Sequence, residues 1–222
     1  MSARDTVLGK IRRSLGVTGE EPRRNATVDD RLSRPVKGVI PARAQVPPGD
    51  QVALFIKLAE KAAATVDRIA DEAAIPEAVA QFLRAHNLPA ALRMGDDPML
   101  NSLSWQRTSI AVTRGATNGS DTVGLSHAHG AVAETGTLVL VSGTANPTTI
   151  NFLPETHIIV VKSTDVVGDM EAIWPRLRAE YGKGAMPRTV NMVTGPSRSG
   201  DIEQQLLLGA HGPRRLHIVV VG

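Results

Sequence analysis

Ile158-Ile-Val-Val161 and His217-Ile-Val-Val-Val221 carry the strongest signal of fold in this chain of 222 residues. Each is a short, uninterrupted apolar run, which is typical of a strand covered on both faces. Helix-like segments alternate with these and other strand-like segments along the sequence. The alternation predicts an α/β domain: a Rossmann-like, mainly parallel sheet with helices on both faces.

The other elements are predicted outward from these two runs. Asp50 is expected to cap a helix, and Pro76 to lie at the start of another. The expected strands are residues 66–70, 90–94, 109–113, 132–142, 157–162, 189–194 and 216–221, and the expected helices are 50–62, 76–86, 169–181 and 200–208.

The first 49 residues have a different composition from the rest. Residues 2–15 form an amphipathic pattern with Ser2 as the expected cap and Gly16 as the stop. Residues 17–49 are rich in proline and charge, and predict a linker or a wrapping arm. We therefore expect an N-terminal arm over residues 1–49, suited to a partner or subunit contact, and an α/β domain over residues 50–222.

Composition excludes several classes of function. The chain has no cysteine, so it cannot hold thiolate metal sites or cysteine-ligated iron–sulfur clusters itself. Residues 1–50 hold 10 of the 25 Lys and Arg residues but only 6 of the 22 acidic ones, and aromatic residues are few, which argues against a nucleic-acid surface. We find no long apolar run, leader pattern or nucleotide-binding glycine motif, and expect a cytoplasmic protein without a membrane span.

One acid stands between two apolar runs, in Ala131-Val-Ala-Glu134-Thr-Gly-Thr-Leu-Val139. Burying a carboxylate there costs several kcal/mol unless it is paired or hydrogen-bonded. Glu134 is therefore a candidate catalytic acid or base, with Thr135, Gly136 and Thr137 as candidate ligand-binding residues. The alternative is that Glu134 braces the turn through the amides of Thr-Gly-Thr.

A second candidate site lies in the segment from Thr194 to Glu203, predicted to end a strand and open a helix. Helix N–H groups together with the Arg198 guanidinium would suit a carboxylate or a phosphate. The alternative for the polar residues is ordinary helix capping. The candidate ligand-binding residues of this segment are Gly195, Ser197, Arg198, Asp201 and Glu203.

Histidines supply the remaining candidates. His211 lies in a glycine-flanked turn, where it could carry a proton or only pin the turn. Glu155 and His157 are weaker candidates at the start of a strand. His127 and His129 alternate on one strand and could form a three-histidine metal site with His157, but without an evident acid partner we expect no metal site.

Several of these segments resemble the LUD domain, in the order in which that family carries them. The similar segments are Ala133-Glu-Thr-Gly-Thr-Leu-Val-Leu140, Leu153-Pro-Glu-Thr-His-Ile-Ile-Val-Val161, Gly195-Pro-Ser-Arg198 with Asp201-Ile-Glu203, and Leu208-Gly-Ala-His-Gly-Pro-Arg-Arg-Leu-His217. The resemblance covers roughly residues 50–222 and is to the lactate utilization protein C type of the family. His129 and Gly130 depart from the acidic and bulky residues common in relatives, which bears on the ligand more than on the fold.

The resemblance implies a fold related to the ribose-5-phosphate isomerase, glucosamine-6-phosphate deaminase and CoA-transferase group. It also implies a subunit that helps oxidise L-lactate to pyruvate with two cysteine-rich iron–sulfur partner proteins. We expect this chain to bind a small carboxylate or phosphate and to carry no cofactor. The alternatives are a stand-alone isomerase or CoA-transferase-like enzyme and a scaffold protein with a vestigial pocket. The sequence leaves open the hydroxy acid, the oligomeric state and any catalytic step on this chain.

Overall fold

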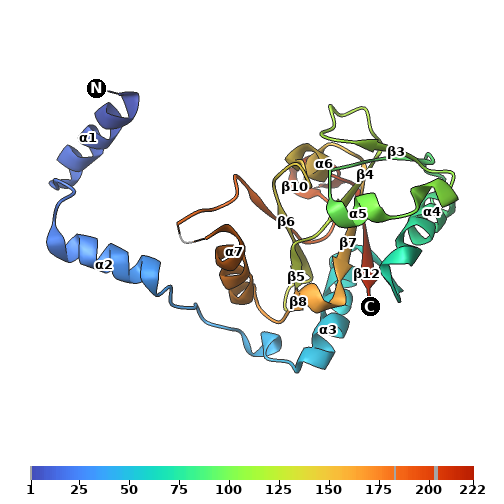
Figure 1. Ribbon diagram of the computed structural model, residues 1–222, viewed down its shortest axis with the longest axis horizontal. Coiled ribbons are helices and arrows are strands. Elements are labelled where there is room, and N and C mark those ends of the chain that lie inside the picture. Colours follow the sequence, from blue (N-terminus) through green and yellow to red (C-terminus); the bar gives the residue numbers. More distant parts are fainter. Residues whose placement is uncertain (1, 183, 203–204) are drawn as a thin grey trace. The chain divides into compact units, whose positions relative to one another are not determined.

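The computed structural model describes residues 2–182, 184–202 and 205–222, and the side chains of all of these except residues 201, 202, 205 and 206. The chain divides into two compact units, residues 1–39 and residues 40–222. Figure 1 shows the elements of both units in chain order.

The first unit consists of two helices without buried residues. Helix α1 (Ala3–Leu15) begins with a reciprocal cap between Ser2 and Asp5 and ends at Gly16, which has a left-handed φ of 63°. Helix α2 (Pro22–Ser33) lies in the segment expected to be a linker or a wrapping arm, where the sequence analysis predicted no helix. Pro22 occupies the first turn, where its missing N–H is harmless, and no proline or glycine interrupts the next 12 residues.

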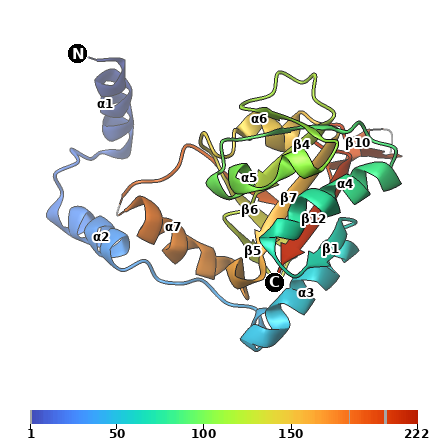
Figure 2. The same ribbon diagram turned by 45° about the vertical axis from the view of Figure 1, so that its right-hand side comes forward.

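The second unit is built on a parallel sheet, which confirms the predicted fold class. Its six described strands lie in the order β1-β12-β7-β4-β2-β3, and every neighbouring pair is parallel. Figures 1 and 2 show β4, β7 and β12 side by side. The bounds are β1 Thr65–Ile69, β12 Arg215–Val221, β7 Thr156–Lys162, β4 Val123–His127, β2 Ala91–Met94 and β3 Ala111–Arg114.

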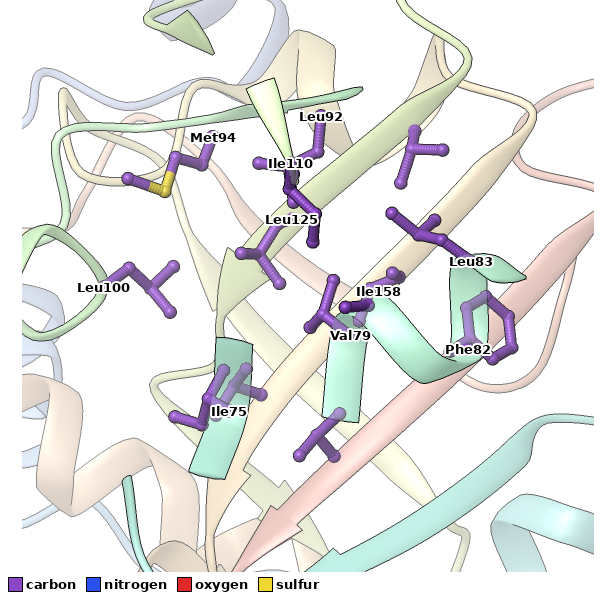
Figure 3. Close-up of a cluster of buried hydrophobic side chains, with 14 of the residues drawn as sticks. Ile75, Val79, Phe82, Leu83, Leu92, Met94, Leu100, Ile110, Leu125 and Ile158 are labelled. Carbon is purple, nitrogen blue, oxygen red and sulfur yellow. The ribbon is translucent and has the colours of Figure 1, made fainter. Parts of the chain in front are cut away.

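Helices cover one face of this sheet. Ile158 and Val160 of β7 point into a core formed with α4 (Ile75–Ala85) and α5 (Pro98–Ser102). Figure 3 shows the α4 side chains packed over Leu125 and Ile158. The apolar positions of α4 recur with helical spacing, so one side of the helix is buried and removes apolar surface from water.

The other face is covered by helix α3 (Pro48–Lys61) and by a second sheet that the sequence did not predict. Ile159 and Val161 of β7 pack with Phe55 of α3 and Leu138 of the second sheet. That sheet has the order β8-β5-β6-β9, and α7 (Ile173–Tyr181) packs on its outer side. Its strands are β8 Val166–Val167, β5 Gly130–Val132, β6 Thr137–Val141 and β9 Val190–Val193.

The helix predicted over residues 200–208 is wrong. Strands β10 (Arg198–Ile202) and β11 (Gln205–Leu208) form an antiparallel hairpin, in which Arg198 is opposite Leu208. A helix of nine residues is marginal by itself, and Gly200 weakens it further, whereas pairing satisfies the same backbone groups. The predicted cap at Asp50 is also wrong, because α3 begins at Pro48 and places Asp50 in its first turn.

Short elements complete the unit. Helix α6 (Thr148–Phe152) precedes β7, and single 3-10 turns connect other elements. These turns are η1 Ala42–Ala44, η2 Glu72–Ala74, η3 Trp105–Arg107, η4 Ser163–Asp165 and η5 Met170–Ala172. Within the described residues, every helix falls short of the length and apolarity that a bilayer crossing requires.

Candidate functional site

The turn Thr135-Gly136-Thr137 connects β5 to β6 and packs directly against α3. Gly136 has a φ of +67°, and a Cβ atom there would lie 2.4 Å from the backbone nitrogen of Ala59. Glycine is therefore required both by conformation and by space. Beside it, the Thr137 hydroxyl lies 2.7 Å from that of Thr135 and 2.6 Å from that of Thr194, which directly follows β9.

Glu134 is buried, as its position between apolar runs predicted, with 6% of its surface exposed. Its Oε1 accepts a hydrogen bond of 3.1 Å from the backbone N–H of Met170. Its Oε2 lies 3.5 Å from Nε of Arg43 and accepts no hydrogen bond from the described residues. The carboxylate thus braces the segment that leads into α7, and not the Thr-Gly-Thr amides.

A broad open depression of about 590 Å³ lies over this turn. Glu134, Thr135, Thr137 and Thr194 contribute to its lining, together with the end of α3. The structure therefore brings together the predicted residues of the first candidate site, except that Gly136 faces the backbone of α3.

A smaller cavity of about 270 Å³ adjoins it and shares Thr194. Gly195, Ser197, Arg198 and His211 line this cavity, so residues of the second and third sequence motifs meet here. Ser197 links the loop after β9 to the turn before β12. Its hydroxyl oxygen accepts a hydrogen bond of 3.2 Å from the backbone N–H of His211. Its backbone N–H also donates to the Pro213 carbonyl at 2.8 Å.

The sequence analysis predicted that helix N–H groups and Arg198 would together attract an anion here, but the structure provides only Arg198. Arg198 begins a strand, so no helix N-terminus contributes at this point. The cavity is also lined at the amino ends of β7 and β12, through His157 and Leu216, and not at the carboxyl edge of the parallel sheet. Arg198 is exposed and donates one hydrogen bond of 2.9 Å to the Ala62 carbonyl, which leaves other guanidinium N–H groups to meet an anion.

His157, a weaker candidate in the sequence, lies fully buried where it lines this cavity. Its Nε2 lies 2.9 Å from Oγ of Ser126, which in turn contacts the side-chain oxygens of Asn146 and Asn151. Burial lowers the pKa of His157 to about 3, so the ring is neutral at physiological pH. Sequence reasoning missed Ser126, Asn146 and Asn151, because their association depends on strand pairing between β4 and β7.

The other predicted histidines lie elsewhere. His127 and His157 fall on opposite faces of the sheet, because His157 is paired with Gly124, three positions before His127. His127 contacts Asp97 at 3.2 Å, and His129 contacts Glu180 at 3.2 Å. No group of three potential metal-ligating side chains occurs among the residues that the structure describes.

Glu155 does not line the smaller cavity. Glu155 is exposed, 3.7 Å from Arg214, and lines a separate outer depression that includes His211. The side chain of Asp201 and all of Glu203 lie outside the described residues.

The fold and the two adjoining cavities define an α/β protein in which an arginine, Arg198, lines the smaller cavity. The LUD domain family model matches residues 52–221, and the chain belongs to this family, which confirms the resemblance seen in the sequence.

Relatives support the same family. Lactate utilization protein C of Geobacillus thermodenitrificans is 40% identical over 100 residues, which cover 45% of this chain and 42% of that protein. The protein of the same name from Bacillus subtilis is 34% identical over 100 residues, with the same coverage. Each match thus spans less than half of the relative's length.

A solved structure shares the fold. The DUF162 family protein of Deinococcus radiodurans superposes with a TM-score of 0.58 and 21% identity. The superposition covers 80% of this chain and 99% of that chain.

Proposed function

We propose that this chain is a non-redox subunit of a lactate-utilization system, and that it binds a small carboxylate in the cavity beside Arg198. Supporting this, the relatives it matches over part of their length are named lactate utilization protein C. The observation that carries the binding proposal is the guanidinium of Arg198 at a cavity of about 270 Å³, a size suited to a ligand of few atoms.

The lack of cysteine in this chain decides which protein of the proposed system holds the redox centre. Oxidation of L-lactate to pyruvate removes two electrons, which must pass to a redox centre. The chain has no cysteine to hold an iron–sulfur cluster, so in this proposal cysteine-rich partner proteins in the cytoplasm hold the clusters. This chain then supplies ligand binding and contacts with those partners.

Glu134 supports this proposal over a free-standing isomerase or CoA-transferase. A base or nucleophile must reach its substrate, yet one oxygen of Glu134 is bound to a backbone N–H and the side chain is buried. A brace is the better description of this carboxylate.

Reconstitution tests the proposed role. The tagged full chain should co-purify with iron–sulfur proteins from a lactate-grown host, and the complex should reduce an electron acceptor when L-lactate is added. Arg198→Ala should lower that activity, whereas Arg178→Ala, which removes an exposed arginine of α7, should not. Full activity of the Arg198→Ala complex would favour a scaffold with a vestigial pocket. Turnover of a sugar phosphate or an acyl-CoA by the isolated chain would favour the enzyme alternative.

A further inference from the structure

The cavity beside Arg198 is larger than L-lactate requires. Its volume of about 270 Å³ equals that of about nine water molecules, at about 30 Å³ each. L-lactate has fewer non-hydrogen atoms than this, and bonded atoms take up less space than separate waters. L-lactate would therefore leave part of the cavity to water, and the residues around that part decide what else fits there.

Much of the wall of this cavity is apolar. The apolar side chains that line it are Phe152, Met192, Val193, Pro196, Pro213 and Leu216. Phe152 is 44% exposed and Met192 is 38% exposed, so both leave apolar surface that a ligand can cover. Removing such surface from water is favourable, so the wall favours a ligand with an apolar part.

The Phe152 ring lies beside the loop that carries Arg198. An ideal Cβ atom on Gly212 would lie 3.8 Å from Cδ1 of Phe152 and 3.5 Å from Cβ of Ser197. Phe152, Ser197 and Gly212 all line the cavity, and Ser197 directly precedes Arg198 in the chain. The aromatic ring and the arginine therefore belong to one continuous wall.

The Arg198 guanidinium is placed by a second contact. It donates to the carbonyl oxygen of Ala62 at 2.9 Å, and an ideal Cβ atom on Gly195 would lie 2.1 Å from that same oxygen. Gly195 and Arg198 both line the cavity, so the cation lies at the part of the wall formed by Gly195. Among the residues that the structure describes, no second arginine or lysine lines the cavity, so a second carboxylate would lack a cationic partner.

We infer that this cavity takes monocarboxylic 2-hydroxy acids whose side chain is longer and more apolar than the methyl group of lactate. The carboxylate lies at Arg198, and the side chain of the ligand covers Phe152 and Met192. This inference rests on the proposed function and names the substrate class of the same site. Arg198 supplies attachment for any 2-hydroxy acid, and the apolar wall selects among them.

Calorimetric titration of the full chain with L-lactate, L-2-hydroxybutyrate and L-2-hydroxypentanoate tests the inference, because each acid has one methylene more than the last. Affinity should rise about two- to fourfold with each methylene, and the larger factor applies to complete burial. Affinity that stays equal or falls along the series would overturn the inference and leave the carboxylate site standing. Binding of none of the three acids would overturn both.

L-malate tests the restriction to one carboxylate. Its side chain ends in a second carboxylate, which would lie against the apolar wall without a cationic partner. L-malate should therefore bind more weakly than L-2-hydroxybutyrate. L-malate that binds as tightly as L-2-hydroxybutyrate would overturn the assignment of the site to monocarboxylic acids.

Phe152→Ala sharpens the test, because it removes apolar surface from the wall and leaves Arg198 in place. The gain in affinity for each methylene should then fall toward a factor of about one. Leu153→Ala is the matched control and should keep the wild-type gain. Leu153 is also apolar and 48% exposed, but it lines the outer depression and not the smaller cavity.

A folded Phe152→Ala protein with the wild-type gain would contradict the role given to the apolar wall. The titration series on the unaltered protein decides the inference even where Phe152→Ala does not fold.

Discussion

Oε1 of Glu134 accepts a hydrogen bond from the backbone N–H of Met170 at 3.1 Å, and so links the turn after β5 to the segment that leads into α7. The second oxygen faces Arg43 at 3.5 Å, but the Arg43 side chain is 63% exposed. Most of the stabilisation from Glu134 should therefore come from the buried bond to Met170.

Substitutions of Glu134 and of Arg43 should therefore lower the free energy of unfolding by different amounts. Glu134→Ala should lower the free energy of unfolding by about 1–3 kcal/mol, because a buried N–H loses its acceptor. Glu134→Gln keeps an acceptor and should cost less. Arg43→Ala should cost about 0–1 kcal/mol, as for an exposed ion pair. Urea midpoints give all three values, and a larger effect from Arg43→Ala than from Glu134→Ala would contradict the assignment.

Gly136 should be far less replaceable than a glycine with free space around it. Gly136→Ala forces a Cβ to 2.4 Å from the Ala59 nitrogen at a left-handed φ, and should cost more than about 3 kcal/mol from overpacking and backbone strain together. Gly119→Ala is the matched control, because Gly119 also has a positive φ but no atom within 4 Å of the added Cβ. Similar melting temperatures for the two variants would show that α3 can move away from the turn.

The sequence predicted the parallel sheet because β7 and β12 are buried on both faces and each carries a continuous apolar run, residues 158–161 and 218–221. It predicted strands over residues 132–142 and 189–194, which contain β6 and β9, but not that they form a separate sheet, because their antiparallel pairing depends on contacts distant in sequence. The hairpin of β10 and β11 was mistaken for a helix for the same reason. A local pattern does not specify a partner that is distant in sequence.

The cavity was predicted only in part. Arg198 was predicted because a guanidinium at the end of a strand suits an anion, and His211 because a histidine in a glycine-flanked turn could carry a proton. Ser126 and Asn151 carry no local signal, and His157 was predicted only as a weaker candidate. Their meeting depends on the register that places Ser126 beside β7, which single residues do not reveal.

Two buried histidines predict a loss of stability in acid. Burial lowers the pKa of His157 to about 3 and that of His217 to about 4, below the ordinary value of 6.5. The unfolded chain then binds more protons below pH 6.5, so stability is complete above that pH and falls as the pH drops toward 4 and 3. Each histidine should contribute a loss of about 2 kcal/mol between pH 7 and pH 5.

Urea midpoints between pH 7 and pH 5 check this prediction. His157→Gln and His217→Gln should each flatten the pH dependence. A wild-type protein equally stable at both pH values would contradict the assignment of two buried, neutral rings.

The N-terminal boundary of the α/β unit can be located by truncation. Deleting residues 2–39 should leave its melting temperature nearly unchanged, because neither α1 nor α2 contains a buried residue. Deleting residues 2–45 should lower it, since Ala44 is 4% exposed and its carbonyl packs against Gly168. Calorimetric melts of the two truncated chains should therefore differ by several degrees, and identical melts would show that residues 40–45 add nothing.

The central claim is that Arg198 makes the smaller cavity a carboxylate site, and calorimetric titration of L-lactate tests it most directly. Arg198→Ala should weaken binding about tenfold or more, because charge-assisted hydrogen bonds contribute roughly 1.5–3 kcal/mol. Arg198→Lys should recover only part of the affinity, since an ammonium lacks the planar fork. Arg178→Ala should bind L-lactate as the wild type does. Affinity that is unchanged in a folded Arg198→Ala protein would contradict the account.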